Sequence, residues 1–388
     1  MIRHIGAFLL LAALLGFTLF AFAERRADGI AAKPGWNLIG VSDAEIPLET
    51  AVKAKAVLAR QPLNQPVLNL LFAVESRGDL APDRRERFIE TLGALGWRDT
   101  AAQQNLIVET LRDGDPSEAV RRADALLRRG KLVSNIVAIL AQIEIYPEAA
   151  DLLIERLAKQ PPWRDRYFAF NGTLRNQSAL DARVRLFDKM LAKRMTLTRS
   201  DLKVSLDAMV RAGMHDEVLQ IAMAANPDGA SQSALYDPDF AKFVALAPRE
   251  RDKPLPFEWA VVSRPGTSAM IVPRSGKGQL QIRWNGVGAP VVASTMTMLQ
   301  EGDAVRLEVH ADGIDALTAL DSFSFGLACS GKDRVTFDVA QAPKDNVAYY
   351  SATERAMCDY PQFIVYGRPQ AADRQAETAI DAIRLSVS

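Results

Sequence analysis

Hydrophobic and polar positions follow three different patterns along the 388 residues. Residues 5–23 carry no charged side chain. From about residue 48 to residue 247, apolar residues recur every three or four positions, which is typical of amphipathic helices. Beyond that point, short segments alternate apolar and polar residues, which is typical of half-buried strands. These patterns predict an N-terminal segment, a spacer, a helical repeat domain and a β-sandwich domain, at residues 1–23, 24–47, 48–247 and 248–388.

The uncharged run is 19 residues long (5 through 23) and is flanked by basic residues. A helix needs about 17–25 apolar residues to span a bilayer, whereas the apolar part of a cleaved signal peptide has about 7–15. The length therefore favours an uncleaved membrane anchor. Cleavage after Ala23 is the open alternative, because Ala21-Phe22-Ala23 has the small-x-small form that signal peptidase accepts.

In both cases we expect the rest of the chain to be exported. An uncleaved segment would anchor the protein in the inner membrane of a bacterial cell envelope, with its body in the periplasm. A cleaved segment would leave a periplasmic or secreted protein.

Helix-start signals recur at regular spacing in the helical region. Asp115, Pro116 and Glu118 can serve as N-cap, first-turn proline and capping-box acid of one helix. Similar starts fall near Leu48, Pro82, Asp115, Pro147, Gln177 and His215. Subtracting successive numbers gives separations of 34, 33, 32, 30 and 38 residues. A helix-turn-helix unit of about 34 residues resembles the tetratricopeptide repeat, which stacks into a solenoid. The alternative is an ordinary all-helical domain with coincidental spacing.

The C-terminal pattern predicts a β-domain. Leu280, Ile282 and Trp284 share one face of a strand, which leaves Gln281 and Arg283 on the outward face. In the strand expected at 304–311, the histidine at position 310 is also outward. Many short strands separated by Gly or Pro are typical of an antiparallel sandwich, and a jelly roll fits best. The expected fold class is therefore multidomain, with an α-helical tetratricopeptide-like solenoid followed by an antiparallel β-sandwich (jelly roll).

Charge and cysteine content narrow the class of protein. Lys+Arg and Asp+Glu both number 47, so the net charge is zero. A nucleic-acid-binding protein would show a basic excess, so we expect no nucleic-acid partner. The two cysteines, Cys329 and Cys358, both lie in the predicted β-domain. In an exported chain such a pair favours a disulfide over a metal site or nucleophile, with two separate buried thiols as the alternative.

Residues typical of catalytic or cofactor sites are scarce. The three histidines have no metal-ligand spacing, and the sequence has no nucleophile elbow, Walker loop or dinucleotide-binding loop. We therefore expect no catalytic residue, no cofactor and no metal. Glu258 and Asp381 could form a glycosidase-like pair, but solvated surface acids are the favoured interpretation. The ligand-binding candidates are the outward residues Gln281, Arg283 and His310.

Tryptophans offer another way to bind sugar. Trp97, Trp163, Trp259 and Trp284 lie in segments that we expect to be folded. An exposed tryptophan suits sugar-ring stacking, because it has a large apolar face and a polar N–H. Alternation favours a core position for Trp284, and Trp163 is expected to pack between helices. The sequence therefore does not locate a sugar-stacking tryptophan.

Four short motifs stand out: Gln61-Pro62-Leu63-Asn64, Pro161-Pro162-Trp163-Arg164, Leu235-Tyr236-Asp237-Pro238-Asp239-Phe240 and Pro256-Phe257-Glu258-Trp259. With Cys358, Gln362 and the closing strand 380–385, they resemble a group of bacterial envelope proteins. Those proteins pair tetratricopeptide-like helices with a carbohydrate-module-like sandwich. The resemblance covers most of residues 48–388 and implies a role in exopolysaccharide or cell-surface glycan production. It carries no catalytic residues to transfer.

Together these observations predict a non-enzymatic binding or scaffold protein outside the cytoplasm, acting in cell-surface polysaccharide assembly or export. The helical solenoid would bind a protein partner, the β-sandwich would bind glycan, and the N-terminal segment would contact the membrane. Two alternatives stay open. One is a glycan-modifying enzyme with its acids on the sandwich, and the other is a purely structural adaptor.

Overall fold

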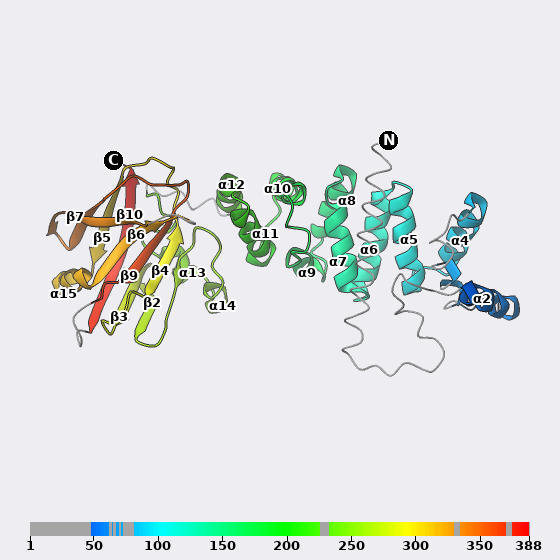
Figure 1. Cartoon of the computed structure of the whole chain (residues 1–388), viewed down its shortest axis with the longest axis horizontal. Helices are drawn as coiled ribbons and strands as arrows, with labels where there is room; N and C mark the ends of the chain where they lie inside the picture. Colours follow the sequence, from blue (N-terminus) through cyan, green and yellow to red (C-terminus); the bar gives the residue numbers. More distant parts are fainter. Residues whose placement is uncertain are drawn as a thin grey trace. The chain divides into compact units, whose positions relative to one another are not determined.

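We describe a computed structural model of the chain, which places residues 48–61, 64, 67–69, 71–72, 81–225, 233–329, 334–369 and 375–387 (Figure 1). The predicted membrane segment and the spacer lie outside these described residues. Within the described part, no helix has both the length and the apolar character needed to cross a bilayer. The chain divides into two compact units, Met1–Leu186 and Phe187–Ser388.

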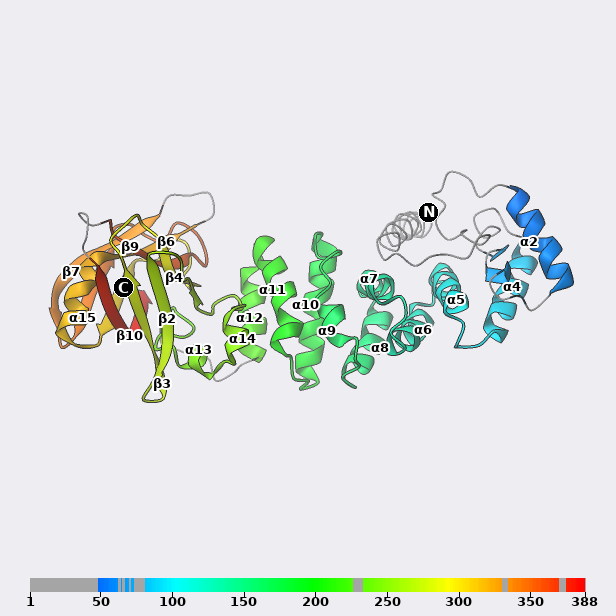
Figure 2. The same ribbon diagram turned by 90° about the horizontal axis from the view of Figure 1, so that it is seen from below.

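The first unit is helical. Helix α6 packs against α5, α7 and α8, and these helices stand side by side in Figure 1 and Figure 2. The helices up to the division between the units are α2 (Leu48–Arg60), α4 (Pro82–Ala94), α5 (Thr100–Arg112), α6 (Pro116–Arg128), α7 (Val133–Ile143), α8 (Pro147–Leu157), α9 (Arg164–Phe168) and α10 (Gln177–Ala192), which crosses it. With α12, which begins at His215, a helix starts at or one residue after each of the six predicted positions, so these starts are confirmed.

Helix α6 shows how the local sequence sets a helix. The Asp115 carboxylate accepts the backbone N–H of Glu118 at 2.9 Å, and Pro116 occupies the first turn. The capping-box role predicted for Glu118 is wrong, because its side chain pairs with Arg121 and Arg122 instead, both at 2.9 Å. The apolar face of α6 is buried as predicted from its spacing: Ala119, Val120, Ala123, Leu126 and Leu127.

A buried ion pair joins α10 to the end of α7. The Arg183 guanidinium donates to both carboxylate oxygens of Glu144, at 2.9 and 2.8 Å, and both side chains are at most 2% exposed. The Tyr167 hydroxyl of α9 donates to the same carboxylate. Burial, together with the negative charge of Glu144, raises the pKa of the Tyr167 hydroxyl well above its ordinary value. The hydroxyl therefore keeps its proton and remains a donor to Glu144.

The second unit combines helices with strands. Its further helices are α11 (Arg199–Arg211), α12 (His215–Ala225), α13 (Ala241–Ala245), α14 (Pro248–Arg251) and α15 (Gly313–Ala319), followed by the 3-10 turn η2 (Leu320–Ser322). The strands are β1 (Ala260–Val261), β2 (Thr267–Arg274), β3 (Lys277–Trp284), β4 (Val291–Met296), β5 (Val305–Ala311), β6 (Phe323–Ala328), β7 (Val335–Lys344), β8 (Val347–Ala352), β9 (Gln362–Gly367) and β10 (Ala376–Val387).

The described strands form one antiparallel 10-stranded sheet in the order β1-β4-β9-β6-β7-β8-β5-β10-β3-β2. The sheet folds into two layers, one of β1, β4, β9 and β6 and the other of β8, β5, β10, β3 and β2. Strand β7 links the layers, because it pairs with β6 on one side and with β8 on the other. Strands β1 and β4 also approach β2, so the sheet is nearly closed. A helical part followed by an antiparallel, jelly-roll-like sheet is therefore confirmed.

The two layers enclose a core rich in aromatic side chains. The Trp259 ring meets the Phe363 ring edge-on at 6.1 Å between centroids. Phe240 packs on Gly278, where an added Cβ would lie 2.5 Å from the Phe240 Cβ. This close approach explains why position 278 needs a residue without a side chain. The segment before the proline-marked boundary at residue 248 thus contributes to the same core, through Leu235, Phe240 and Phe243.

Two polar contacts fix α11 and α12 to the β-rich part. The Arg199 guanidinium binds both carboxylate oxygens of Glu258, with Nη2 2.7 Å from Oε2. The Tyr360 hydroxyl donates to the Asp216 carboxylate in the first turn of α12, and the Tyr360 ring lies 5.4 Å from the His215 ring. Both contacts join a helix to a loop of the β-rich part.

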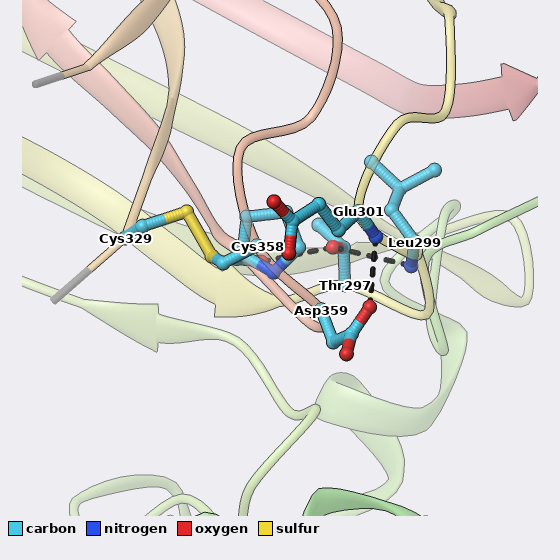
Figure 3. The surroundings of a disulfide bond; sticks show 7 residues. Thr297, Leu299, Glu301, Cys329, Cys358 and Asp359 are labelled. Carbon is cyan, nitrogen blue, oxygen red and sulfur yellow. Dashed lines mark hydrogen bonds between the residues drawn. A yellow bond between two sulfur atoms is a disulfide. The ribbon is translucent and has the colours of Figure 1, made fainter. Parts of the chain in front are cut away.

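Cys329 and Cys358 form the predicted disulfide, which joins the end of β6 to the loop before β9 (Figure 3). In that loop, the Asp359 carboxylate accepts the backbone N–H of Glu301 at 2.8 Å (Figure 3). In the same loop, the carbonyl oxygen of Pro361 accepts a hydrogen bond from the Thr297 hydroxyl at 2.9 Å. The disulfide thus ties this loop to the end of β6, and the two hydrogen bonds tie it to the connection between β4 and β5.

We expect Arg183→Met to lower the free energy of unfolding of the helical part by about 3–5 kcal/mol, because it leaves the buried Glu144 carboxylate without its ionic partner. Urea unfolding followed by far-UV circular dichroism measures this loss. Arg121→Met is the matched control, since that side chain is 52% exposed in its pair with Glu118 and should change stability by less than about 1 kcal/mol. Equal effects of the two variants would contradict the prediction.

Replacing both cysteines, in Cys329→Ser/Cys358→Ser, should lower the free energy of unfolding of the β-rich part by about 3–4 kcal/mol. The reason is that the disulfide links residues 29 positions apart and restricts the unfolded chain accordingly. Tryptophan fluorescence during urea unfolding reports this transition through the buried Trp259 and Trp284. The unaltered protein under reducing conditions should match the double variant, and an unchanged midpoint in both would refute the prediction.

Candidate ligand-binding face

The three ligand-binding candidates lie on the outward face of one layer. Gln281 and Arg283 are in β3 and His310 is in β5, and β10 runs between these two strands. The predicted alternation holds in β3, because Leu280 and Ile282 are buried while Gln281 and Arg283 are exposed. The fold therefore brings the candidates to one face, with a strand that sequence reasoning did not place between them.

Arg283 lies in an exposed cross-strand pair. Its Nε donates to Glu377 Oε1 at 2.9 Å, and Glu377 sits directly opposite on β10. The two side chains are 73% and 65% exposed, so water competes strongly for the pair and it adds little to stability. The guanidinium is thus accessible to a ligand on this face.

Gln279, which the sequence did not single out, organises the centre of the face. Its amide nitrogen donates to Asp381 at 2.8 Å and to Asp312 at 3.2 Å. Its amide oxygen accepts from Gln281 at 3.0 Å. Because Gln279 lies two residues before Gln281 on the same strand, strand alternation was the signal that could have found it. We call Gln279, Gln281, Asp312, Asp381 and Arg274 the polar network.

Arg274 pairs with both acids of the polar network. Its guanidinium pairs with the Asp312 carboxylate and lies 3.5 Å from Asp381. The hydrogen bond from Arg274 holds the pKa of the Asp312 carboxyl below its ordinary value, with a smaller contribution from Gln279. Asp312 is therefore ionised at neutral pH and acts as an acceptor rather than as a proton donor.

His310 lies on the same face, beside the polar network. Its Nε2 has no hydrogen-bond partner among the described residues, and the Glu308 carboxylate is 3.7 Å away. Burial, followed by the positive charge of Arg384, lowers the pKa of the imidazole, while Glu308 and Asp381 act in the opposite direction. The ring is therefore neutral at neutral pH, and its Nε2 atom is buried beneath this face.

Two less polar side chains flank this face. Met270 of β2, directly opposite Gln281, is 50% exposed. Tyr349 of β8 lies directly opposite Glu308 and is partly exposed. Together with the polar network and His310, they make a surface with donors and acceptors at its centre and apolar contact at its sides.

The acid pair considered from the sequence, Glu258 with Asp381, is not brought together as a reacting pair. Glu258 binds Arg199 and also accepts the backbone N–H of Leu255 at 2.6 Å, whereas Asp381 belongs to the polar network. Among the placed parts of the chain, no group of three or more His, Cys, Asp and Glu side chains is arranged to hold a metal ion. The chemistry that this face offers is hydrogen bonding and charge pairing.

The tryptophans of the described residues differ widely in exposure. Trp163, Trp259 and Trp284 are at most 2% exposed, and the expected core position of Trp284 is confirmed. Trp163 is buried in the helical part, where its indole N–H donates to Asp124 at 2.9 Å. Trp97, in the turn between α4 and α5, is 51% exposed. No tryptophan of the described residues therefore lies on the outward face of the sheet.

We expect an NMR titration of the His310 imidazole to give a midpoint below 6.5, its ordinary pKa. Arg384→Ala should raise that midpoint, because it removes a charge that disfavours the imidazolium, and Glu308→Gln should lower it further. Arg306→Ala, which removes a cation farther along β5, is the control and should leave it unchanged. A midpoint above 6.5 in the unaltered protein would disprove this account.

The lowered pKa of His310 also makes the stability of the β-rich part depend on pH. Because the folded-state pKa lies below the unfolded value, the unfolded chain takes up the proton first as the pH falls. His310 therefore destabilises the folded β-rich part as the pH drops below about 6.5. His310→Gln should reduce that loss when unfolding is compared at neutral and mildly acidic pH.

The sequence matches no family model and no curated protein. The resemblance to tetratricopeptide-like envelope proteins therefore stays a prediction, and the function rests on the residues and contacts described above.

Proposed function

We propose that this chain is a non-enzymatic binding or scaffold protein of the bacterial cell envelope, acting in cell-surface polysaccharide assembly or export. Its β-rich part binds glycan, its helical part receives a protein partner, and its N-terminal segment attaches it to the membrane or directs its export. The observation that carries the proposal is the outward face of β3, β10 and β5, with the polar network at its centre.

The composition of that face suits a polyhydroxylated ligand. Sugar hydroxyls both donate and accept hydrogen bonds, and the face presents amide, carboxylate, guanidinium and imidazole groups within one area. The mutual hydrogen bonds of Gln279, Asp312 and Asp381 hold these groups in place before a ligand arrives, which lowers the entropic cost of binding. Met270 and Tyr349 supply apolar contact for sugar C–H groups at the flanks.

The state of the acids favours binding over glycan hydrolysis. A glycosidase uses one carboxylic acid with a raised pKa as a proton donor and a second carboxylate as base or nucleophile. Here Arg274 holds the pKa of Asp312 below its ordinary value and also lies near Asp381. Asp312 is thus better suited to accept hydrogen bonds from sugar hydroxyls than to protonate a glycosidic oxygen.

The helical part supports a role in protein binding. The even-numbered helices α2, α4, α6, α8, α10 and α12 start at residues 48, 82, 116, 147, 177 and 215, so successive starts are 30–38 residues apart. Helix α6 packs against its neighbours on both sides, as in a tetratricopeptide-like solenoid. A hollow of about 410 Å³ lies between the turns that precede α6 and α8, lined by Leu111, Pro116 and Tyr146 with Asp115 and Glu148. Its size matches recesses that accept a small ligand or a few side chains.

The disulfide supports a location outside the cytoplasm. Disulfides persist in oxidising compartments such as the bacterial periplasm and are rare in the cytosol. The disulfide between Cys329 and Cys358 in the described chain therefore agrees with the export expected from the first 23 residues.

A glycan array, followed by calorimetric titration of each hit with the full chain, tests the proposal. We expect binding to a bacterial polysaccharide, and Gln281→Ala/His310→Ala should weaken it about fivefold to tenfold or more, since each lost hydrogen bond is worth about 0.5–1.5 kcal/mol. Gln362→Ala is the matched control, because it removes an exposed amide from β9 in the other layer.

Two results would count against this function. One is the lack of binding to both neutral and acidic polysaccharides. The other is an equal loss of affinity in Gln362→Ala, which would place the ligand away from the polar network. Release of reducing sugar from a bound glycan would instead favour the glycan-modifying enzyme.

A further inference from the structure

Trp97 stands apart from the other tryptophans of the folded segments. It lies in the turn between α4 and α5 with 51% of its surface exposed, whereas Trp163, Trp259 and Trp284 are at most 2% exposed. Neither the polar face of the sheet nor the core of the helical part uses it. An indole that is kept at the surface is available for contact with another molecule.

The backbone around Trp97 is held firmly. The Arg129 guanidinium, in the turn between α6 and α7, donates to the carbonyl oxygen of Trp97 and, at 2.7 Å, to that of Arg98. It also donates to the Thr100 hydroxyl at 3.3 Å. The turns at residues 96–99 and 129–132 are thereby fastened to each other, so their side chains share one surface.

The ring of Trp97 is oriented by a second arginine. The Arg122 guanidinium lies 5.1 Å from the indole centroid, close enough for a cation–π contact. Arg122 is itself fixed, because it donates to Gln103 Oε1 at 2.9 Å and pairs with Glu118 at 2.9 Å. One part of the indole is therefore covered by a fixed guanidinium, and the remainder faces solvent.

The two fastened turns carry several positive charges. Arg98 and Lys131 are exposed, and neither side chain has an ion pair or hydrogen bond with another described residue. Arg129 is bonded to carbonyl and hydroxyl oxygens, so its charge is also not neutralised by a carboxylate. The acid in the same turn, Asp99, is used as the N-cap of α5. We call Trp97, Arg98, Arg129 and Lys131 the basic turn surface.

We propose that the basic turn surface binds an anionic polysaccharide, one whose sugar rings carry carboxylates. A pyranose ring has an apolar face of C–H groups that can stack on the exposed indole. Its carboxylates can pair with Arg98 and Lys131, the guanidinium offering a two-pronged contact. This goes beyond the proposed function, because it names a charged class of glycan and places it on the helical part, on residues separate from those of the sheet.

Calorimetric titration of the full chain tests the proposal with an oligogalacturonate as probe. A neutral oligosaccharide of the same length and a polyglutamate of equal charge are the comparisons. We expect the oligogalacturonate to bind more tightly than either, because only it offers both a ring face and a carboxylate. Raising the salt from about 0.05 to about 0.5 M should weaken this binding, since the contacting charges are exposed.

Four variants locate the site. Trp97→Ala should weaken binding about fivefold to tenfold, and Arg98→Ala/Lys131→Ala about tenfold with loss of most of the salt dependence. Phe170→Ala is the aromatic control, being a partly exposed ring after α9, and Lys253→Ala is the charge control, being an exposed cation in the other unit. Both controls should bind like the unaltered protein.

Quenching by acrylamide gives a second readout that does not depend on a variant. The probe should shield the exposed Trp97 from acrylamide in the unaltered protein. Equal binding of polyglutamate would overturn the proposal in favour of a surface for acidic protein, and unchanged affinity in Trp97→Ala would overturn it as well. Loss of affinity in Gln281→Ala/His310→Ala but not in Trp97→Ala would support the polar face and refute the basic turn surface, so the two proposals fail separately.

Discussion

The fold of the first unit depends on pairing its buried carboxylates, which among the described residues are Glu109, Asp124 and Glu144, with donors from other segments. Each helix must bury one apolar stripe against its neighbours, and an acid caught in that contact costs several kcal/mol unless it is paired. Asp124 of α6 receives the Trp163 indole, and Glu144 after α7 receives Arg183 of α10. These pairings favour one set of neighbours among helices whose apolar stripes are otherwise interchangeable.

The same constraint applies where the helices meet the sheet. The buried Asp237 accepts the backbone N–H groups of Lys242 at 3.1 Å and Phe243 at 2.9 Å, both of which belong to the first turn of α13. Burial raises the pKa of the Asp237 carboxyl, although these backbone bonds oppose the change. By binding these N–H groups, the buried Asp237 carboxylate fixes the path of the segment that carries Phe240 and Phe243 into the core of the β-rich part.

Local signals made the helices and strands predictable. Pro116 and the N-cap Asp115 fix the first turn of α6. Alternation in β3 separates the buried Leu280 and Ile282 from the outward Gln281 and Arg283. Pairings across long sequence separations could not be read in this way, because they depend on which elements become neighbours. The Glu144–Arg183 pair spans 39 residues, and it is invisible to any pattern with a period of two or 3.6 residues.

The candidate site shows the same limit. The outward positions of Gln281, Arg283 and His310 follow from alternation, but their grouping depends on β10 lying between β3 and β5. That order brings Asp381 to Gln279, 102 residues away in the sequence, and Arg384 close enough to His310 to lower its pKa. The exposure of Trp97 could not be predicted from the sequence either, because it depends on contacts with Arg122 and with the turn that Arg129 holds.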